Sequence, residues 1–220
     1  MEKKITQELL SKSYERLEDR AQFDLDFIFL TIVAAVICTF GFRMNSTSVI
    51  IGAMVLSPLL FVIVAIGASL FHRRWEKFFA NLITLIGGMA IVVAVSFIVN
   101  SFFPTINASE ITERIINEPL DYLFVAFFSG LAGTFAFFWP DIIEAVTGIA
   151  ISVALVPPVV LAGIGLSRWD LSLLASCLEI ASINILGIII GSFIMIIALN
   201  LHSKNIHYDK SKISTLQRKR

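Results

Sequence analysis

The chain has 220 residues, of which 57% are hydrophobic and only 15% carry charge, with a net charge of zero. This composition lies outside the range of soluble domains and predicts an integral membrane protein. The two cysteines, Cys38 and Cys177, lie in separate apolar runs, which argues against a disulfide framework and against a zinc site of paired cysteines.

Six segments are long and apolar enough to cross a bilayer, which takes about 20 residues. In chain order they are 23–42, 46–71, 78–103, 120–139, 142–166 and 171–199. The rest forms a polar N-terminal tail at 1–22, an acidic loop at 104–119 and a basic tail at 200–220. We therefore expect an all-α membrane protein with six transmembrane helices and, because the first 22 residues are polar, no cleaved secretory signal.

Lys and Arg residues are distributed unevenly between the two sides of these spans. The two tails and the connection at 72–77 carry fourteen of them, whereas Arg43, Arg114 and Arg168 fall on the other side. Because positive loops stay inside, both termini are predicted to be cytoplasmic. The expected location is the cell membrane, the inner one where a cell has two.

The two halves of the chain repeat each other in short stretches. Three pairs of segments match in the same order at offsets of 95, 100 and 94, namely 25–27 with 120–122, 55–60 with 155–160, and 73–76 with 167–170. The sequence thus predicts two three-helix units, 23–103 and 120–199. Because three crossings is an odd number, the second unit is predicted to be inverted in the membrane relative to the first.

Prolines interrupt the second span of each unit. Pro58 follows Ser57 in the middle of one span, and Pro157-Pro158 interrupts the fifth. Proline removes a helical hydrogen bond and clashes with the preceding turn, so both helices are predicted to break near mid-membrane. Facing broken helices in an inverted repeat commonly build a binding site. The alternative is that each proline only kinks a packed helix.

Glu179 is the outstanding polar residue, because a carboxyl group well inside a span usually faces a polar interior. Three serines lie within about 60° of it on a helical wheel, and at an offset of 95 the pair Ser176 and Glu179 corresponds to Asn81 and Thr84. Glu179 is predicted to bind a cation or exchange a proton. Equally open is a protonated glutamate that bonds a neighbouring helix. The serines are Ser172, Ser176 and Ser182.

Small residues near Asn184 predict close helix packing, since Gly187 and Gly191 have the spacing that lets membrane helices approach. With many such residues a homo-oligomer is expected. The sequence holds none of the catalytic or phosphate-binding motifs of hydrolases and ATP-driven pumps. Hence we expect no enzyme, cofactor, metal or nucleic-acid partner, but a protein that meets the lipid bilayer and a small solute or ion.

Two stretches resemble a known family, catalogued as domain of unknown function 389. They are the run Gly-Ala-Met-x-x-Ser-Pro within 43–59 and Ala-Leu-Val-Pro-Pro at 154–158, and the likeness extends over about 23–199. The resemblance implies a bacterial or archaeal multi-span membrane protein without an established substrate. It marks as characteristic the positions Gly52, Ser57, Pro58, Pro157, Pro158 and Asn184.

The first functional hypothesis is a transporter or channel for a small solute or ion, with coupling to a cation or proton. Its candidate binding residues are those at the breaks and the polar residues of the third and sixth spans: Ser57, Pro58, Asn81, Thr84, Pro157, Pro158, Ser176, Glu179 and Asn184. The alternative is a membrane scaffold or sensor without transport, in which the proline breaks serve packing.

Overall fold

The computed structural model describes residues 14–104, 119–138 and 155–217. In these ranges the chain is helical and has no strand, which confirms the all-α class. After a helical segment at 14–20, the helices are α2 (Leu25–Arg43), α3 (Thr47–Leu56), α4 (Leu59–Phe71), α5 (Trp75–Phe102), α7 (Pro119–Phe138), α9 (Val156–Ser167) and α10 (Leu171–Gln217).

Four or five of these helices can cross a membrane. α2, α5, α7 and the part Leu171–Asn200 of α10 each suffice alone, and α3 with α4 forms one broken span. The first four predicted spans and the sixth are therefore present as apolar helices. Of the fifth predicted span only α9 is described, because residues 142–154 lie outside the described ranges, so six crossings remain a prediction.

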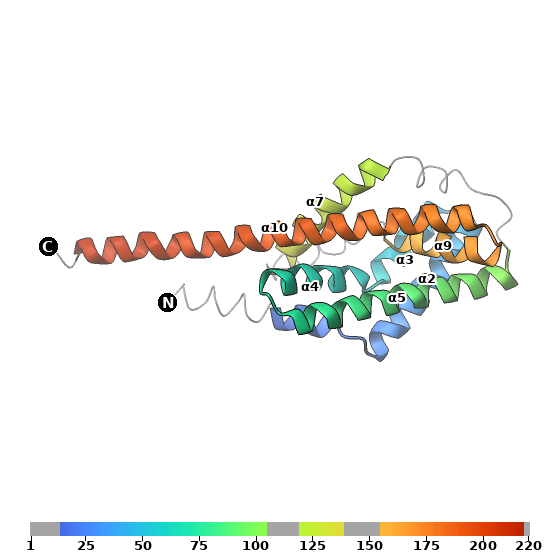
Figure 1. Ribbon diagram of the computed structural model, residues 1–220, viewed down its shortest axis with the longest axis horizontal. Coiled ribbons are helices and arrows are strands. Elements are labelled where there is room, and N and C mark those ends of the chain that lie inside the picture. Colours follow the sequence, from blue (N-terminus) through green and yellow to red (C-terminus); the bar gives the residue numbers. More distant parts are fainter. Residues whose placement is uncertain (1–13, 105–118, 139–154, 218–220) are drawn as a thin grey trace.

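α10 is longer than the sequence predicted. It continues past residue 199 to Gln217, because no glycine or proline follows Gly191 to end it. Figure 1 shows this last part leaving the rest of the described helices and projecting alone.

The break at Pro58 follows directly from the local sequence. Proline disfavours the helical conformation in the residue before it, and Ser57 is extended, with φ −74° and ψ 127°. α3 ends at Leu56, α4 begins at Leu59, and their axes differ by 50°. The predicted break in the second span is confirmed.

α9 begins at the double proline. Pro157 and Pro158 lie in its first turn, just after Val156. A helix tolerates proline there because the first N–H groups have no helical partner to lose. Whether a helix precedes this start cannot be read from the described residues, so the second broken helix stays a prediction.

The two short helices lie between the two long ones. α4 contacts α5, α10 and α7, whereas α9 contacts α10, α5 and α2. In Figure 1, α4 and α9 occupy opposite halves of the space between α5 and α10. The packing of α4 is therefore matched by that of α9 when α2 is exchanged with α7, and α5 with α10.

The corners that follow the two short helices have the same backbone. Each has a residue with positive φ, 53° at Arg73 and 59° at Trp169. The next residue donates its N–H to the carbonyl five residues back, from Arg74 to Ser69 at 3.0 Å and from Asp170 to Gly165 at 2.9 Å. Equivalent corner residues, Arg73 and Trp169, are thus 96 positions apart. The sequence match at this corner, which paired Trp75 with Trp169, had an offset of 94.

The same offset of 96 matches the buried faces of α5 and α10. Every buried residue of α5 has a buried counterpart on α10 at that distance along the chain. The pairs are Asn81 with Cys177, Thr84 with Ile180, Leu85 with Ala181, Gly88 with Asn184, Val92 with Ile188, Ser96 with Ser192, and Asn100 with Ile196.

Two helix crossings also match at this offset. α4 meets α10 at Gly67, where an added Cβ atom would lie 2.9 Å from the Cβ atom of Ser192. α9 meets α5 at Gly163, where it would overlap the side chain of Ser96 and lie 2.6 Å from the carbonyl oxygen of Val93. Each short helix thus approaches a long helix of the other half through a glycine and a serine, as small residues allow in membranes.

The two ends of the molecule differ in charge. At the end we call the basic end, Glu18 pairs with Arg74 at 2.6 Å and with Lys77 at 3.2 Å. Asn200, at the end of the sixth span, reaches the same place through a hydrogen bond with Tyr14. The start of the described chain, the 72–77 connection and the start of the C-terminal tail therefore share one end, as the charge count grouped them.

The opposite end is held by two polar contacts, of which the second joins the two halves. The Arg43 guanidinium donates to the carbonyl oxygen of Pro104 at 2.9 Å, and the Asn100 amide donates to the Ser167 hydroxyl at 2.7 Å. The loops grouped on this side by charge thus also meet.

The glycine crossings predict a graded response to added methyl groups. Gly163→Ala should lower the unfolding free energy in detergent by about 1–3 kcal/mol, because the Val93 carbonyl belongs to a helix backbone and cannot rotate away. Gly67→Ala should cost less. Gly52→Ala is the control, since nothing lies within 4 Å of the added atom. Thermal unfolding that is equal for Gly163→Ala and Gly52→Ala would contradict the crossing.

Candidate functional site

Four of the nine predicted site residues lie buried beside the break at Pro58 or in the first turn of α9. Ser57, Pro58, Pro157 and Pro158 are all buried, and the broken span and α9 are in contact through α3. The Ser57 hydroxyl accepts a weak hydrogen bond from the Leu59 N–H at 3.5 Å. This bond satisfies one of the donors left free at the start of α4.

α5 contacts the start of α4 at Gly88, which has no side chain. A Cβ atom on Gly88 would lie 2.7 Å from Leu59 Cδ2 and 2.9 Å from Phe27 Cζ. Leu59 is itself only 1% exposed. The break after Ser57 is therefore sealed on this side by direct contact between helices.

Asn184 occupies the position on α10 that Gly88 occupies on α5. It is 2% exposed, and α10 contacts α9 as α5 contacts α4. α5 thus has a bare backbone at this position, whereas α10 has a buried amide that can both donate and accept hydrogen bonds.

The end of α3 offers carbonyl acceptors, and the start of α9 has fewer N–H donors than an ordinary helix start. The last four carbonyl groups of a helix have no partner within it, and at the end of α3 the Met54 carbonyl accepts from the Ser57 N–H at 3.4 Å. At the start of α9, two of the first three residues are prolines and have no N–H. Such a place suits a cation or a hydrogen-bond donor better than an anion.

Asn81 and Thr84 lie away from the breaks, toward the basic end. The Asn81 amide donates to the Ser69 hydroxyl at 3.1 Å, which ties α5 to α4. Thr84 donates to the carbonyl of Ala80 in its own helix at 3.1 Å. Both are buried, and their observed contacts are those of helix packing.

Glu179 lies on the exposed side of α10, with Ser176 half-buried beside it. Within the described part of one chain, this carboxyl group thus lies on the outward side of the helix. The buried side of α10 runs through Cys177, Ile180 and Asn184. Because each residue turns the helix by about 100°, Glu179 lies on a different side. An ion-binding role for Glu179 stays a prediction.

The sequence also contains matches at the offset of 96, which the three pairs of segments at offsets of 95, 100 and 94 do not reveal. Ser96 and Ser192 each begin the tripeptide Ser-Phe-Ile, and Gly67 and Gly163 are separated by the same 96 residues. The three shorter matches had different offsets, which obscured this constant one.

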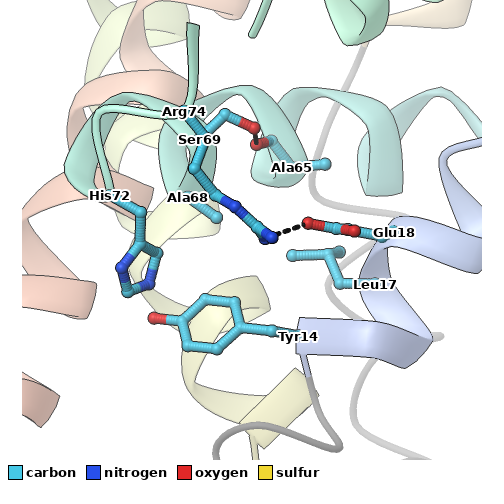
Figure 2. A pocket seen from close by; sticks show the side chains of 8 residues that line it. All are labelled: Tyr14, Leu17, Glu18, Ala65, Ala68, Ser69, His72 and Arg74. Atoms are coloured by element: carbon cyan, nitrogen blue, oxygen red, sulfur yellow. Dashed lines mark hydrogen bonds and ion pairs between the residues drawn. The ribbon is translucent and has the colours of Figure 1, made fainter. Parts of the chain in front are cut away.

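A second polar cluster holds the N-terminal segment 14–20 against the corner of α4 and α5. Figure 2 shows Tyr14, Leu17 and Glu18 facing the end of α4, with the Glu18 carboxylate directed at Arg74. Leu17 is 1% exposed. The Tyr14 ring stands edge-on to the His72 ring, with 4.6 Å between centroids.

Burial and nearby charges shift the pKa values of the two ring side chains in this cluster, His72 and Tyr14. Burial lowers the pKa of His72 from its ordinary 6.5, and the nearby Arg74 lowers it further, while Glu18 acts in the opposite direction. Burial raises the pKa of Tyr14 to about 12, against a hydrogen bond with Asn200 that lowers it. The cluster therefore favours a neutral imidazole and a neutral phenol.

Comparison with known proteins identifies the family. The profile of a family described as a domain of unknown function, DUF389, matches residues 54–190. The chain belongs to the DUF389 family. The match includes Ser57, Pro58, the double proline at 157–158 and Asn184, so these candidate residues lie within the DUF389 region, whereas Ser192 lies just beyond it. The resemblance seen in the sequence is confirmed.

A curated relative gives no further function. An uncharacterised protein of Methanocaldococcus jannaschii is 23% identical over 191 residues, which cover 86% of this chain and 58% of that protein. The chain thus spans less than two thirds of the length of this relative. No solved structure matches the chain.

The His72 pKa predicts a pH-dependent contact at the basic end. Contact with segment 14–20 buries His72 and lowers its pKa, so as the pH falls the imidazole takes up a proton more readily when the segment is undocked. Docking is therefore fully stable above pH 6.5 and weakens below it. The rate of amide hydrogen exchange at 14–20, corrected for intrinsic rates, should increase when the pH is lowered from 7.5 to 5.5. In His72→Phe, which keeps the ring contact, this rise should vanish, and an equal rise in both proteins would contradict the assignment.

Proposed function

We propose that the chain is a transporter or channel for a small solute or ion, without catalytic activity, built as an inverted repeat of three and three helices. The observation that carries the proposal is the matched packing of α4 and α9. Each is a short, buried helix that begins at a proline break and crosses a long helix of the other half through a glycine.

The directions of the helices support inversion. α5 starts beside the basic end, at Arg74, and ends near Ser167 at the opposite end. α10 starts just after Ser167 and has Asn200 at the basic end. The two long helices that match at an offset of 96 therefore run in opposite directions, as the equivalent helices of inverted repeats do.

The break at Pro58 and the start of α9 at a double proline support a substrate site between the two halves. In inverted-repeat transporters the substrate lies near mid-membrane, between discontinuous helices of the two repeats. Non-helical backbone is tolerated at that depth where protein or a water-filled cavity covers it. Ser57, the end of α3, the start of α9 and Asn184 are the groups that we propose to line the path.

We further propose that the transported species is a monovalent cation or an uncharged hydrogen-bond donor. The prolines at the start of α9 remove donors, whereas the end of α3 presents carbonyl groups. In the cell, the positive-inside rule assigns the basic end to the cytoplasm and the chain to the cell membrane.

Flux through proteoliposomes tests this proposal. Purified protein should raise the flux of H⁺, Na⁺ or K⁺, or of urea or glycerol, at least tenfold above protein-free liposomes. Asn184→Leu and Pro157→Ala should lose most of that flux, because the first removes the amide and the second alters the start of α9. Dyes report the ions, and light scattering reports the neutral solutes.

The control is Gly52→Ala, whose added methyl group meets open space. It should keep the flux of the unchanged protein, and all variants should elute as single species with similar unfolding temperatures. Flux that survives in both Asn184→Leu and Pro157→Ala would overturn the assignment of the path. The absence of flux for all five solutes would favour the second candidate.

That second candidate is a membrane scaffold or sensor. It is favoured by two features at the basic end, the docked segment 14–20 and the projecting part of α10. A scaffold needs no path at the breaks. It predicts that a cysteine in place of Ser57 stays unreactive toward a small water-soluble maleimide.

A further inference from the structure

The outward face of α10 is polar where the bilayer should meet it. Ser172, Glu179 and Ser182 are exposed, and Ser176 between them is half-buried. Glu179 lies eight residues from the start of the helix, about 12 Å along its axis. Within the described part of the chain, no hydrogen bond or ion pair involves its carboxyl group.

The equivalent face of α5 is apolar. At the offset of 96, Glu179 corresponds to Ile83, which is 71% exposed, and Ser182 corresponds to Ile86, which is 59% exposed. The two faces lie at equivalent positions along the chain, but the residues are apolar on α5 and polar on α10. The α5 face suits lipid, whereas a carboxyl group in hydrocarbon requires a polar partner.

A second observation concerns the other end of the same helix. α10 extends to Gln217, well beyond the apolar part that ends at Asn200, and projects alone in Figure 1. A lone helix of such length is only marginally stable in water. One elongated partner along α10 would cover both the exposed face at Glu179 and the part of the helix beyond Asn200.

We propose that two copies of this chain pair in parallel along the outward face of α10. The face can pair with itself, because Glu179 accepts hydrogen bonds and serine hydroxyl groups donate them. Within one chain the Ser182 hydroxyl donates to the Leu178 carbonyl at 2.8 Å, and in the pair it turns to Glu179 of the other copy. Around a two-fold axis normal to the membrane, each Glu179 meets serine hydroxyl groups of the other copy, as in an isologous interface. Each carboxyl site is incomplete without the second copy.

Cysteine cross-linking tests the pairing in native membranes. Ser182→Cys, oxidised with copper phenanthroline, should give a reducible band at twice the 24.4 kDa of the chain, at least tenfold stronger than Ile86→Cys does. Ile86→Cys is the matched control at the equivalent position of α5. The unchanged protein is the blank, because Cys38 and Cys177 are buried.

Variants of Glu179 test the chemistry of the contact. Glu179→Gln keeps hydrogen bonding and should keep the dimer, whereas Glu179→Leu, which suits lipid and should fold, should lower the dimer fraction in mild detergent at least fivefold. Ile83→Leu is the control on α5. Equal dimer fractions in Glu179→Leu and the unchanged protein would overturn the proposal.

Other occupants of the face give different results. If lipid or residues 139–154 of the same chain cover it, Ser182→Cys will cross-link no better than Ile86→Cys, and the proposal fails. The test reads association and not flux, so it can succeed or fail independently of the proposed transport. A dimer without flux would leave this interface intact and remove the path.

Discussion

A helix that breaks inside a membrane exposes backbone groups that hydrocarbon cannot satisfy, and the arrangement of this protein follows from covering them. The short helices beside the breaks are the most enclosed: ten of the 13 residues of α4 and ten of the 12 of α9 are buried. The long helices α5 and α10 enclose them and keep outward faces. A helix that is apolar all round belongs in such a centre.

Close approach in this centre depends on residues without bulky side chains. Gly67 and Gly163 let α4 and α9 contact the long helices at Ser192 and Ser96. Because lipid is as apolar as leucine, association of membrane helices gains from van der Waals contact rather than from the hydrophobic effect. The matched crossings therefore contribute stability and fix the relative height of the two short helices.

The sequence predicted the helices and the break at Pro58 well, because apolar length and proline are local signals. The side on which Glu179 lies depends on tertiary packing, since a helix with polar and apolar residues on most sides does not reveal which side meets another helix. The predicted end of the sixth span at residue 199 agrees with the apolar part of α10, which ends at Asn200. Hydropathy does not mark where the helix itself ends, at Gln217. The offset of 96 was present as Ser-Phe-Ile in both halves, but it needed the two corner turns to distinguish it from 94.

The differences between the halves are more informative than their likeness. With the backbone held constant, Gly88 is replaced by Asn184 inside and Ile83 by Glu179 outside. Both changes add a polar group to α10, one beside a helix break and one toward the surface. Such groups are costly in a membrane unless they are used. At other positions the polar residue lies on α5: Asn81, Thr84 and Asn100 correspond to Cys177, Ile180 and Ile196. The two halves therefore place their polar groups at different positions along equivalent helices.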